Sequence, residues 1–446
     1  MADTGFDLIV GLGMSGLSAA AYLRERDMPV RIMDSRDAPP GLDELRERFP
    51  RVPLHLGGFR RDWIKQARRL ILSPGVSPET PQVAEAMATG QEVIGDIELF
   101  ARVADAPIAA ITGSNAKSTV TTLLAEVANA CGKKALAGGN LAPAALDLLD
   151  QDAELYVLEL SSFQLETTFS LRPKVACILN VSADHLDRHH SMTAYIAAKQ
   201  RIYSGCEVAV WNRDDEATRP PASVTRQLSF GEHVEADYRL DAAARQLCVH
   251  GKPVLALADL KLRGLHNALN VLAVLAMAEA LGLPQADVLT TVKNFAGLPH
   301  RCQLVAEAEG VAWFNDSKGT NVGATLAALN GVGAAIDGRI LLLAGGQGKG
   351  QDFAPLAEAA AKYVRSAILF GEDADKLAEG LGAGVEQRRV GSLAEAVQLA
   401  RSLAQAGDAV LLSPACASFD MFKSYVDRGQ QFTRLAEEVT HAKGAP

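Results

Sequence analysis

Short apolar runs recur along the chain, and each is followed by a turn and a stretch with helical spacing of Ala and Leu. Runs of three to five apolar residues are typical of strands buried in a parallel sheet, with the helical stretches as crossovers. In the first region the predicted strands are 8–10, 30–33 and 70–72, and a helix is predicted over 15–24. The pattern therefore predicts βα units and an α/β fold.

The alternation continues through two further regions, so we expect three domains, over residues 1–94, 95–297 and 298–446. We expect a Rossmann-like first domain, a central P-loop-like ATPase domain and a Rossmann-like third domain. The predicted strands of the second and third regions are 107–111, 155–158, 175–179, 312–314, 340–343, 367–370 and 409–412.

Composition narrows the class of protein. The 446 residues carry a net charge of -9 with a pI near 5.6, without the basic footprint of sequence-independent nucleic-acid binding. The six cysteines form no Cys-x-x-Cys pair, which favours reduced thiols. No basic and apolar leader is evident, and the longest apolar stretch, 271–283, is too short to span a bilayer. We expect a cytoplasmic monomer with no membrane partner.

A glycine-rich loop follows the first predicted strand. Gly11, Gly13 and Gly16 have the spacing of a dinucleotide fingerprint, and Asp34 ends the next strand. The glycines permit close approach to a diphosphate, and the acidic side chain can reach a ribose hydroxyl. These residues leave three interpretations open: a NAD or FAD site, a site for another nucleotide diphosphate, and a structural turn.

A second loop, residues 112–119, follows another predicted strand and opens a helix. It resembles a Walker loop, although Ile111 and Ala116 stand where that pattern has glycine. Lys117 would neutralise β- and γ-phosphates, and Ser118 would ligate Mg²⁺. The alternative is a capped helix with an exposed lysine. Two phosphate loops in one chain indicate an enzyme that holds two phosphorylated ligands.

Polar side chains at predicted strand ends are further candidates. Glu159 would be a Mg²⁺ ligand or a solvated helix cap. We favour His185 as a Mg²⁺ or substrate contact and expect His189 and His190 to be solvated, because Asp and Asn neighbours without cysteine disfavour zinc. Lys199 lies on a predicted helix, and from this local sequence alone we expect a solvent-exposed lysine.

Together these motifs resemble the Mur ligase family of peptidoglycan synthesis over nearly the whole chain. The motifs that carry the resemblance are Thr-Gly-Ser-Asn-x-Lys-Ser-Thr from Thr112, Glu-Leu-Ser-Ser-Phe-Gln-Leu-Glu from Glu159, Asn-Val-Ser-x-Asp-His-Leu-Asp from Asn180, His-Asn-x-x-Asn from His266, His300-Arg301, Asn-Asp-Ser-Lys-Gly-Thr-Asn from Asn315 and Pro-Ala-Cys-Ala-Ser-Phe from Pro414. The resemblance implies an ATP-dependent ligase, with two Mg²⁺ ions, that joins D-glutamate to UDP-N-acetylmuramoyl-L-alanine through an acyl phosphate. It also implies a place in cell-wall biogenesis and cell division.

The resemblance assigns roles to individual positions. The catalytic residues would be Lys117, Glu159, His185 and Lys199, and the metal contacts would be Ser118, Glu159, His185 and a carbamylated Lys199. The ATP contacts would be Gly113, Ser114, Asn115, Ala116, Lys117, Ser118, Thr119, Asn267, Asn270, Arg301, Asp316 and Lys318. The UDP-substrate contacts would be Gly13, Met14, Ser15, Gly16, Asp34, Ser35, Arg36, Ser73, Pro74, Gly75, Asn140, Ser161 and His185. The D-glutamate contacts would be Thr320, Lys349, Ser418, Phe419 and Tyr425.

Two residues depart from the family's pattern. Ala116 stands where glycine is common, and because a methyl group is tolerated only at negative φ we expect a negative φ there. Gln347 stands where an acidic residue is common. Three other functions stay open: a Mur-type ligase for another amino acid, a nicotinamide-dependent dehydrogenase that uses the first loop, and a nucleotide-binding regulator without chemistry.

Overall fold

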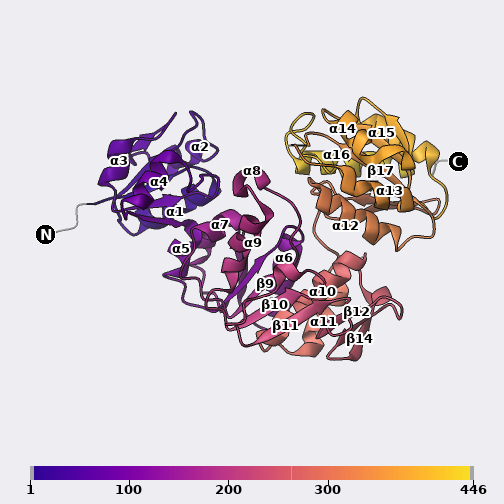
Figure 1. Cartoon of the computed structure of the whole chain (residues 1–446), viewed down its shortest axis with the longest axis horizontal. Helices are drawn as coiled ribbons and strands as arrows, with labels where there is room; N and C mark the ends of the chain where they lie inside the picture. The colour runs from indigo at the N-terminus through magenta and orange to yellow at the C-terminus, as the bar shows by residue number, and fades with distance from the viewer. Residues whose placement is uncertain (1–4, 263, 349, 442–446) are drawn as a thin grey trace. The chain divides into compact units, whose positions relative to one another are not determined.

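The structure is a computed structural model that describes residues 5–262, 264–348 and 350–441 (Figure 1). These residues form two compact units. The first unit runs to Arg239 and includes Cys248–Lys252 and Leu272–Thr291. The second contains Leu240–Leu247, Pro253–Val271 and the described residues from Val292 onward. Each unit is described by itself.

The N-terminal part of the first unit is a parallel sheet of strand order β3-β2-β1-β4-β5. Ile9 packs with α1 and α2 on one face, while Leu8 and Val10 pack with α3 and α4 on the other, as expected for a doubly wound sheet. The elements are β1 (Asp7–Val10), α1 (Met14–Glu25), β2 (Val30–Met33), α2 (Leu42–Arg48), β3 (Leu54–His55), α3 (Arg61–Gln66), β4 (Arg69–Leu72), α4 (Pro81–Ala88), β5 (Glu92–Gly95) and α5 (Asp96–Ala101).

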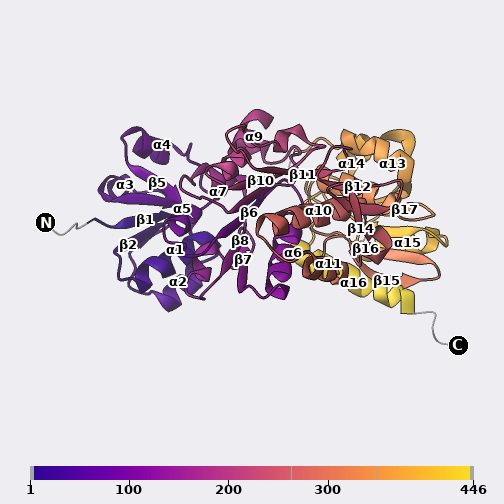
Figure 2. The ribbon, with the colours of Figure 1, turned by 90° about the horizontal axis from the view of Figure 1, so that it is seen from below.

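The next sheet has the strand order β14-β13-β12-β11-β10-β9-β6-β8-β7, and Figure 2 shows β6, β8 and β7 side by side. Its strands are β6 (Ile108–Thr112), β7 (Ala135–Gly139), β8 (Leu155–Glu159), β9 (Val175–Ile178), β10 (Val208–Asn212), β11 (Gln227–Gly231), β12 (Tyr238–Asp241), β13 (Gln246–Val249) and β14 (Lys252–Ala256). Its helices are α6 (Lys117–Ala130), α7 (Ser162–Glu166), α8 (Leu186–His189), α9 (Met192–Gln200), α10 (Leu265–Ala280) and α11 (Gln285–Asn294), with short 3-10 turns at Ala145–Leu148, Arg201–Tyr203, Glu216–Thr218 and Leu257–Asp259.

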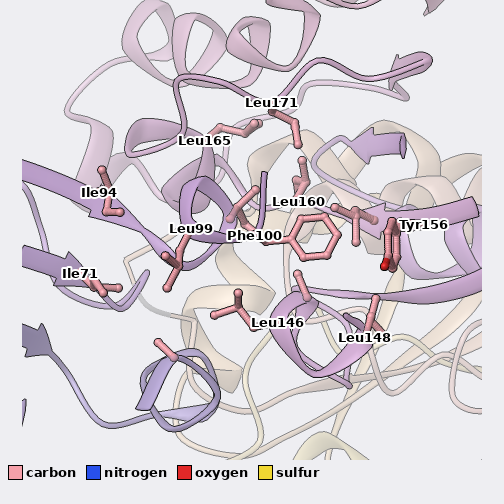
Figure 3. Close-up of a cluster of buried hydrophobic side chains, with 14 of the residues drawn as sticks. Ile71, Ile94, Leu99, Phe100, Leu146, Leu148, Tyr156, Leu160, Leu165 and Leu171 are labelled. Atoms are coloured by element: carbon pink, nitrogen blue, oxygen red, sulfur yellow. The ribbon is translucent and has the colours of Figure 1, made fainter. Parts of the chain in front are cut away.

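One apolar cluster joins the two sheets of the first unit (Figure 3). Ile71 and Ile94 from the N-terminal sheet belong to the same cluster as Tyr156 and Leu160. Phe100 of α5 meets the Tyr156 ring edge-on, with the ring centroids 5.0 Å apart. Apolar burial on this scale is the main stabilising term of folding, so the first and second sheets share one core.

The third sheet, in the second unit, has the order β15-β16-β20-β17-β18-β19, with β15 antiparallel to β16. Alternate residues of β17 pack against α12, α13 and α14 on one face and against α15 and α16 on the other. Figure 2 shows α13 and α14 on one side of β17 and α15 and α16 on the other side. The elements are β15 (Gln303–Ala308), β16 (Val311–Asn315), α12 (Val322–Gly333), β17 (Ile340–Gly345), α13 (Ala357–Tyr363), β18 (Val364–Phe370), α14 (Ala374–Leu381), β19 (Glu386–Arg389), α15 (Leu393–Leu403), β20 (Ala409–Leu412) and α16 (Tyr425–His441), with 3-10 turns at Ala354–Leu356 and Gly382–Gly384.

The predicted strands of all three regions are confirmed within a few residues, and so is the α/β class. The strands that were not among those predicted are β3, β5, β7, β10, β11, β12, β13, β14, β19 and the antiparallel edge strand β15. Across the described ranges, no helix is long and apolar enough to cross a lipid bilayer.

Candidate functional site

The first glycine loop lies between β1 and α1 and is shaped by close backbone contacts. Gly11 has a φ of 99°, and a Cβ at Gly16 would lie 2.0 Å from the Gly11 carbonyl oxygen. Ser73, at the end of β4, donates to that same carbonyl at 2.7 Å. The first glycine loop therefore adjoins the turn after β4, which holds the predicted substrate contacts Ser73, Pro74 and Gly75.

Asp34 is the anchor of this loop. Its carboxylate is 2% exposed, accepts a bond from the Leu12 N–H at 2.7 Å and is paired with Arg36 at 2.7 Å. Burial raises the pKa of this carboxyl, but the Arg36 and backbone hydrogen bonds outweigh it and hold the pKa below its usual value. Met14 stands exposed beside the loop, whereas Ser15 is buried.

The second loop leads from β6 into α6 and gathers positive charge. The Lys117 ammonium donates to the carbonyls of Gly113 and Ser114 at 2.9 and 3.1 Å. The Lys199 ammonium donates to the same Gly113 carbonyl at 2.9 Å. Two lysine side chains at the N-terminus of a helix favour an anionic ligand such as a phosphate.

Ala116 adopts the conformation of the glycine that it replaces. Its φ is 65° and its ψ 0°, so it lies in the left-handed region as the N-cap of α6. The expectation of a negative φ was wrong, because the loop turns into the helix through a left-handed residue at the N-cap position, which Ala116 occupies. The methyl group makes this conformation unfavourable by about 1–2 kcal/mol relative to glycine.

Glu159 lies at the end of β8, next to the second loop. Ser118 Oγ donates to Glu159 Oε2 at 2.5 Å, and Asn140 Nδ2 donates to Glu159 Oε1 at 2.7 Å. The parallel pairing of β8 with β6 on one side and with β7 on the other brings these three predicted residues together. Ser161 begins α7 with a capping box formed with Gln164.

Lys199 is buried, at 1% exposure, on the inner face of α9. Its ammonium lies 4.5 Å from the centroid of the Tyr195 ring, and the Tyr195 hydroxyl is 3.0 Å from Ser114 Oγ. Burial first, and the Lys117 charge second, hold the pKa of Lys199 well below its usual value. The solvent-exposed interpretation of this lysine was therefore wrong.

The three histidines of the 185–190 segment lie in different environments. His185 is half exposed and His190 is exposed, whereas His189 is 5% exposed. The expectation for His190 is confirmed, and that for His189 was wrong because α8 folds its ring onto α7, where it lies 2.9 Å from Ser162 Oγ.

In the second unit, polar residues gather at the carboxyl ends of β16, β17 and β20. Asp316 accepts from Ser413 Oγ at 2.7 Å, and burial raises the pKa of its carboxyl to about 7. Arg428, which sequence analysis did not assign, is fully buried and donates to Ser317 Oγ and to the Cys416 carbonyl at 3.0 and 3.2 Å. Its only sequence signal was the pattern Tyr-x-x-Arg-Gly at residues 425–429, which continues the motif that begins at Pro414.

The remaining predicted residues of this unit occupy varied positions. Ser418 is buried, Thr320 is partly buried and Phe419 is exposed. The Lys318 ammonium lies over the Tyr425 ring at 3.9 Å from its centroid. Asn267 and Asn270 are buried and bonded to each other at 3.0 Å. Lys349 lies outside the described residues.

The described ranges hold no group of three or more His, Cys, Asp or Glu side chains arranged around a metal ion. The hydroxyl of Ser118 and the carboxylate of Glu159 are nevertheless hard oxygen donors, which suit Mg²⁺. The ammonium of Lys199 does not suit it.

Comparisons with known proteins cover all three regions. The Mur ligase MurD-like N-terminal domain matches residues 6–95, the Mur ligase middle domain matches 111–278 and the Mur ligase glutamate ligase domain matches 300–416. The chain belongs to the Mur ligase family. This Mur ligase is 60% identical to a UDP-N-acetylmuramoylalanine--D-glutamate ligase of Alcanivorax borkumensis, over 99% of the chain and 100% of the relative.

Other relatives agree with this family assignment. A protein of the same name from Pseudomonas aeruginosa is 49% identical over 98% of the chain and 99% of its own length. Among solved structures, a MurC ligase of Thermotoga maritima aligns with a TM-score of 0.61 at 19% identity, over 97% of this chain and 99% of its own. A MurF ligase of the same organism in complex with ADP aligns with a TM-score of 0.61 at 15% identity, over 98% and 96%. These structural likenesses concern the fold.

Proposed function

We propose that this Mur ligase joins D-glutamate to UDP-N-acetylmuramoyl-L-alanine at the expense of ATP, in the synthesis of peptidoglycan precursors. The observation that carries the proposal is the 60% identity, over the full length of both chains, to a ligase named for that reaction. We expect it to act in the cytoplasm as a monomer, with neither nucleic acid nor a membrane as partner.

The reaction begins when the alanyl carboxylate attacks the γ-phosphorus of ATP, which breaks the bond to ADP and gives an acyl phosphate. The D-glutamate amine then attacks the acyl carbon, loses a proton and expels inorganic phosphate. A carboxylate that approaches a polyphosphate needs charge neutralisation and in-line positioning. On the protein side, Lys117 and the N–H groups of its loop supply the charge neutralisation.

Lys117 would exchange its present acceptors for phosphate oxygens. Its contacts to the Gly113 and Ser114 carbonyls hold the ammonium over the loop, so a short rotation of the side chain brings it onto a bound phosphate. Mg²⁺, when bound, adds positive charge on the transferring phosphate, and Ser118 and Glu159 would hold it. The number of ions, two, is part of the proposal.

Lys199 would carry a carbamate. A neutral amine is the form that attacks CO₂, and burial beside Lys117 favours that form. The amine nitrogen bonds to the CO₂ carbon and releases one proton, which converts a cationic group into an anionic oxygen donor suited to Mg²⁺. The Tyr195 ring and the Gly113 carbonyl already fix the position of this side chain.

The other ligands would bind through the residues assigned by resemblance. The first glycine loop, with Asp34, Ser35, Arg36 and the Ser73 turn, would hold the UDP group, and Asn140, Ser161 and His185 would contact the rest of that substrate. Thr320, Lys349, Ser418, Phe419 and Tyr425 would hold D-glutamate, and Asn267, Asn270, Arg301, Asp316 and Lys318 would contact ATP.

Phosphate release across a panel of amino acids tests the proposed function. We expect release from ATP only when both UDP-N-acetylmuramoyl-L-alanine and D-glutamate are present, because a pocket built for the side-chain carboxylate leaves its donors unpaired with other amino acids. Equal turnover with L-alanine or a diamino acid would contradict the choice of D-glutamate. Release without any amino acid would contradict the ligase mechanism itself.

A further inference from the structure

The half-exposed His185 rests on an aromatic ring that a second, buried histidine supports. Phe163 meets the His185 ring edge-on, with the centroids 4.8 Å apart. Phe163 also stacks on His189, with the centroids 5.5 Å apart and the ring planes 30° from parallel. Such aromatic pairs contribute roughly 0.5–1.5 kcal/mol beyond their buried area. Support therefore passes from His189 through Phe163 to His185.

Two polar partners fix the orientation of the His189 ring. Nε2 lies 2.9 Å from Ser162 Oγ, and Nδ1 lies 3.3 Å from Glu166 Oε1. The Glu166 carboxylate, paired with Arg188 at 2.7 Å, places negative charge beside Nδ1, which favours the tautomer with its proton on Nδ1. In the neutral ring Nε2 is then the acceptor and the Ser162 hydroxyl is the donor. Both ring nitrogens therefore have a polar neighbour on α7.

The backbone of α8 needs such support. His185 before α8 and His190 after it both lie in the left-handed region, with φ of 54° and 61°. Residues other than glycine hold that conformation only when surrounding contacts favour it. On α7 those contacts come from Ser162, Phe163 and Glu166, and the capping box of Ser161 fixes where α7 begins.

The Ser162–His189–Glu166 arrangement also resembles a serine nucleophile with its base and orienting acid. Ser162 is 3% exposed, however, and His189 is 5% exposed. A substrate cannot reach a hydroxyl buried in this way, so the arrangement serves to hold the ring in place.

We propose that His189 is a positioning residue: locked by Ser162 and Glu166, it backs Phe163 and so holds His185 in place against the UDP-linked substrate. The inference deepens the proposed function and rests on it, because His185 is assigned there as a substrate contact. His189 itself does not touch substrate.

Calorimetric binding of UDP-N-acetylmuramoyl-L-alanine without ATP tests the inference, with ADP as a second ligand. Loss of the stacked ring in His189→Ala should weaken binding of the UDP-linked substrate about tenfold and leave ADP affinity within about twofold. His189→Phe keeps the stack and should lose less affinity. His190→Ala is the matched control, since that neighbouring ring is exposed and pairs with Glu79 on the surface. Melting temperatures identify any variant that fails to fold, and His189→Phe then carries the test.

A double-mutant cycle with His185→Ala separates positioning from general stability. If His189 acts through His185, His189→Ala should cost no further affinity once His185 is absent. An equal loss in both backgrounds, an equal loss of ADP affinity, or wild-type affinity in the His189→Ala and His185→Ala variants would overturn the inference. A wild-type protein that does not bind the UDP-linked substrate at all would overturn the proposed function together with it.

Discussion

At the scale of single residues, Ala116 and Lys117 decide how the second loop meets a phosphate. The left-handed Ala116 turns the chain into α6, and Lys117 follows as the first residue of the helix. The backbone and the cation are therefore set by adjacent residues. Mutations can separate their effects, because we expect Ala116 to affect the stability of the fold and Lys117 to affect the reaction.

Lys117→Ala should lower kcat at least 100-fold while leaving the melting temperature nearly unchanged. Removal of one contact to developing charge typically costs roughly 3–4 kcal/mol, or 10²–10³-fold in rate. Lys133→Ala, an exposed lysine beyond the far end of the same helix, is the control and should retain full activity. Steady-state phosphate release measures both, and activity of Lys117→Ala within about threefold of the wild type would contradict the role.

Ala116→Gly should leave the protein equally stable or more stable by up to about 1.6 kcal/mol. Relief of the left-handed methyl group gains about 1–2 kcal/mol, and the greater freedom of glycine in the unfolded chain offsets about 0.4–1 kcal/mol of that. Ala197→Gly, at an exposed position inside α9, should instead lose about 1 kcal/mol. Urea denaturation of both variants measures these changes in unfolding free energy, which should have opposite signs.

At the scale of elements, the ends of parallel strands bring the candidate groups together. Glu159 ends β8 and Asn140 follows β7, while Ser118 belongs to the helix that β6 leads into. In the second unit, Asp316 and Ser413 follow the adjacent strands β16 and β20 in the same way. Parallel neighbours end at the same edge of a sheet, so residues far apart in sequence become neighbours there.

Helix α9 carries the Lys199 side chain inward, and Lys199→Ala should nearly abolish activity. A small carboxylic acid added to the assay should restore part of it, because it would occupy the anionic position that the carbamate leaves. Lys199→Arg places a permanent positive charge there and forms no carbamate, so it should be inactive as well. Retained activity in Lys199→Ala, without any added acid, would contradict the carbamate.

Asp316, beyond the end of β16, should make stability depend on pH. Burial raises the pKa of its carboxyl to about 7 from an ordinary 3.8, so between these values the folded state keeps a proton that the unfolded state releases. Stability therefore falls as pH rises from 4 to 7, with an upper bound of roughly 4 kcal/mol.

Asp316→Asn removes the titrating carboxyl group and should reduce the decline of stability between pH 4 and pH 7. The difference in unfolding free energy between wild type and variant should decline over this pH range, as measured by urea denaturation at each pH. The exposed Asp375→Asn variant should show the wild-type slope. If the difference in unfolding free energy between wild type and Asp316→Asn is constant from pH 4 to 7, the prediction is contradicted.

At the scale of the whole molecule, three sheets and two phosphate-type loops distinguish a ligase from a dehydrogenase. We expect the chain to bind a UDP-linked sugar at the first loop and to show no tight binding of NAD. Equilibrium titrations with both ligands, and competition between them, check this. Tight NAD(H) binding that a UDP-sugar does not displace would contradict the assignment of the first loop.

The sequence by itself determined the local features. Three- to five-residue apolar runs predicted the parallel strands, and the glycine spacing predicted both loops, because strand burial and turn geometry depend on residues close together in the chain. The resemblance of motifs indicated the Mur ligase family, which the comparisons confirm over all three regions.

Only the tertiary structure decided which polar groups are buried and with what. His189 and Lys199 have no local signal of burial, because contacts from α7 and from the Gly113 loop enclose them. Arg428 lies beneath loops that are distant in sequence. Ala116 took a positive φ because the loop between β6 and α6 imposes it. Burial and strain of this kind arise from packing between separate elements, which no stretch of sequence encodes alone.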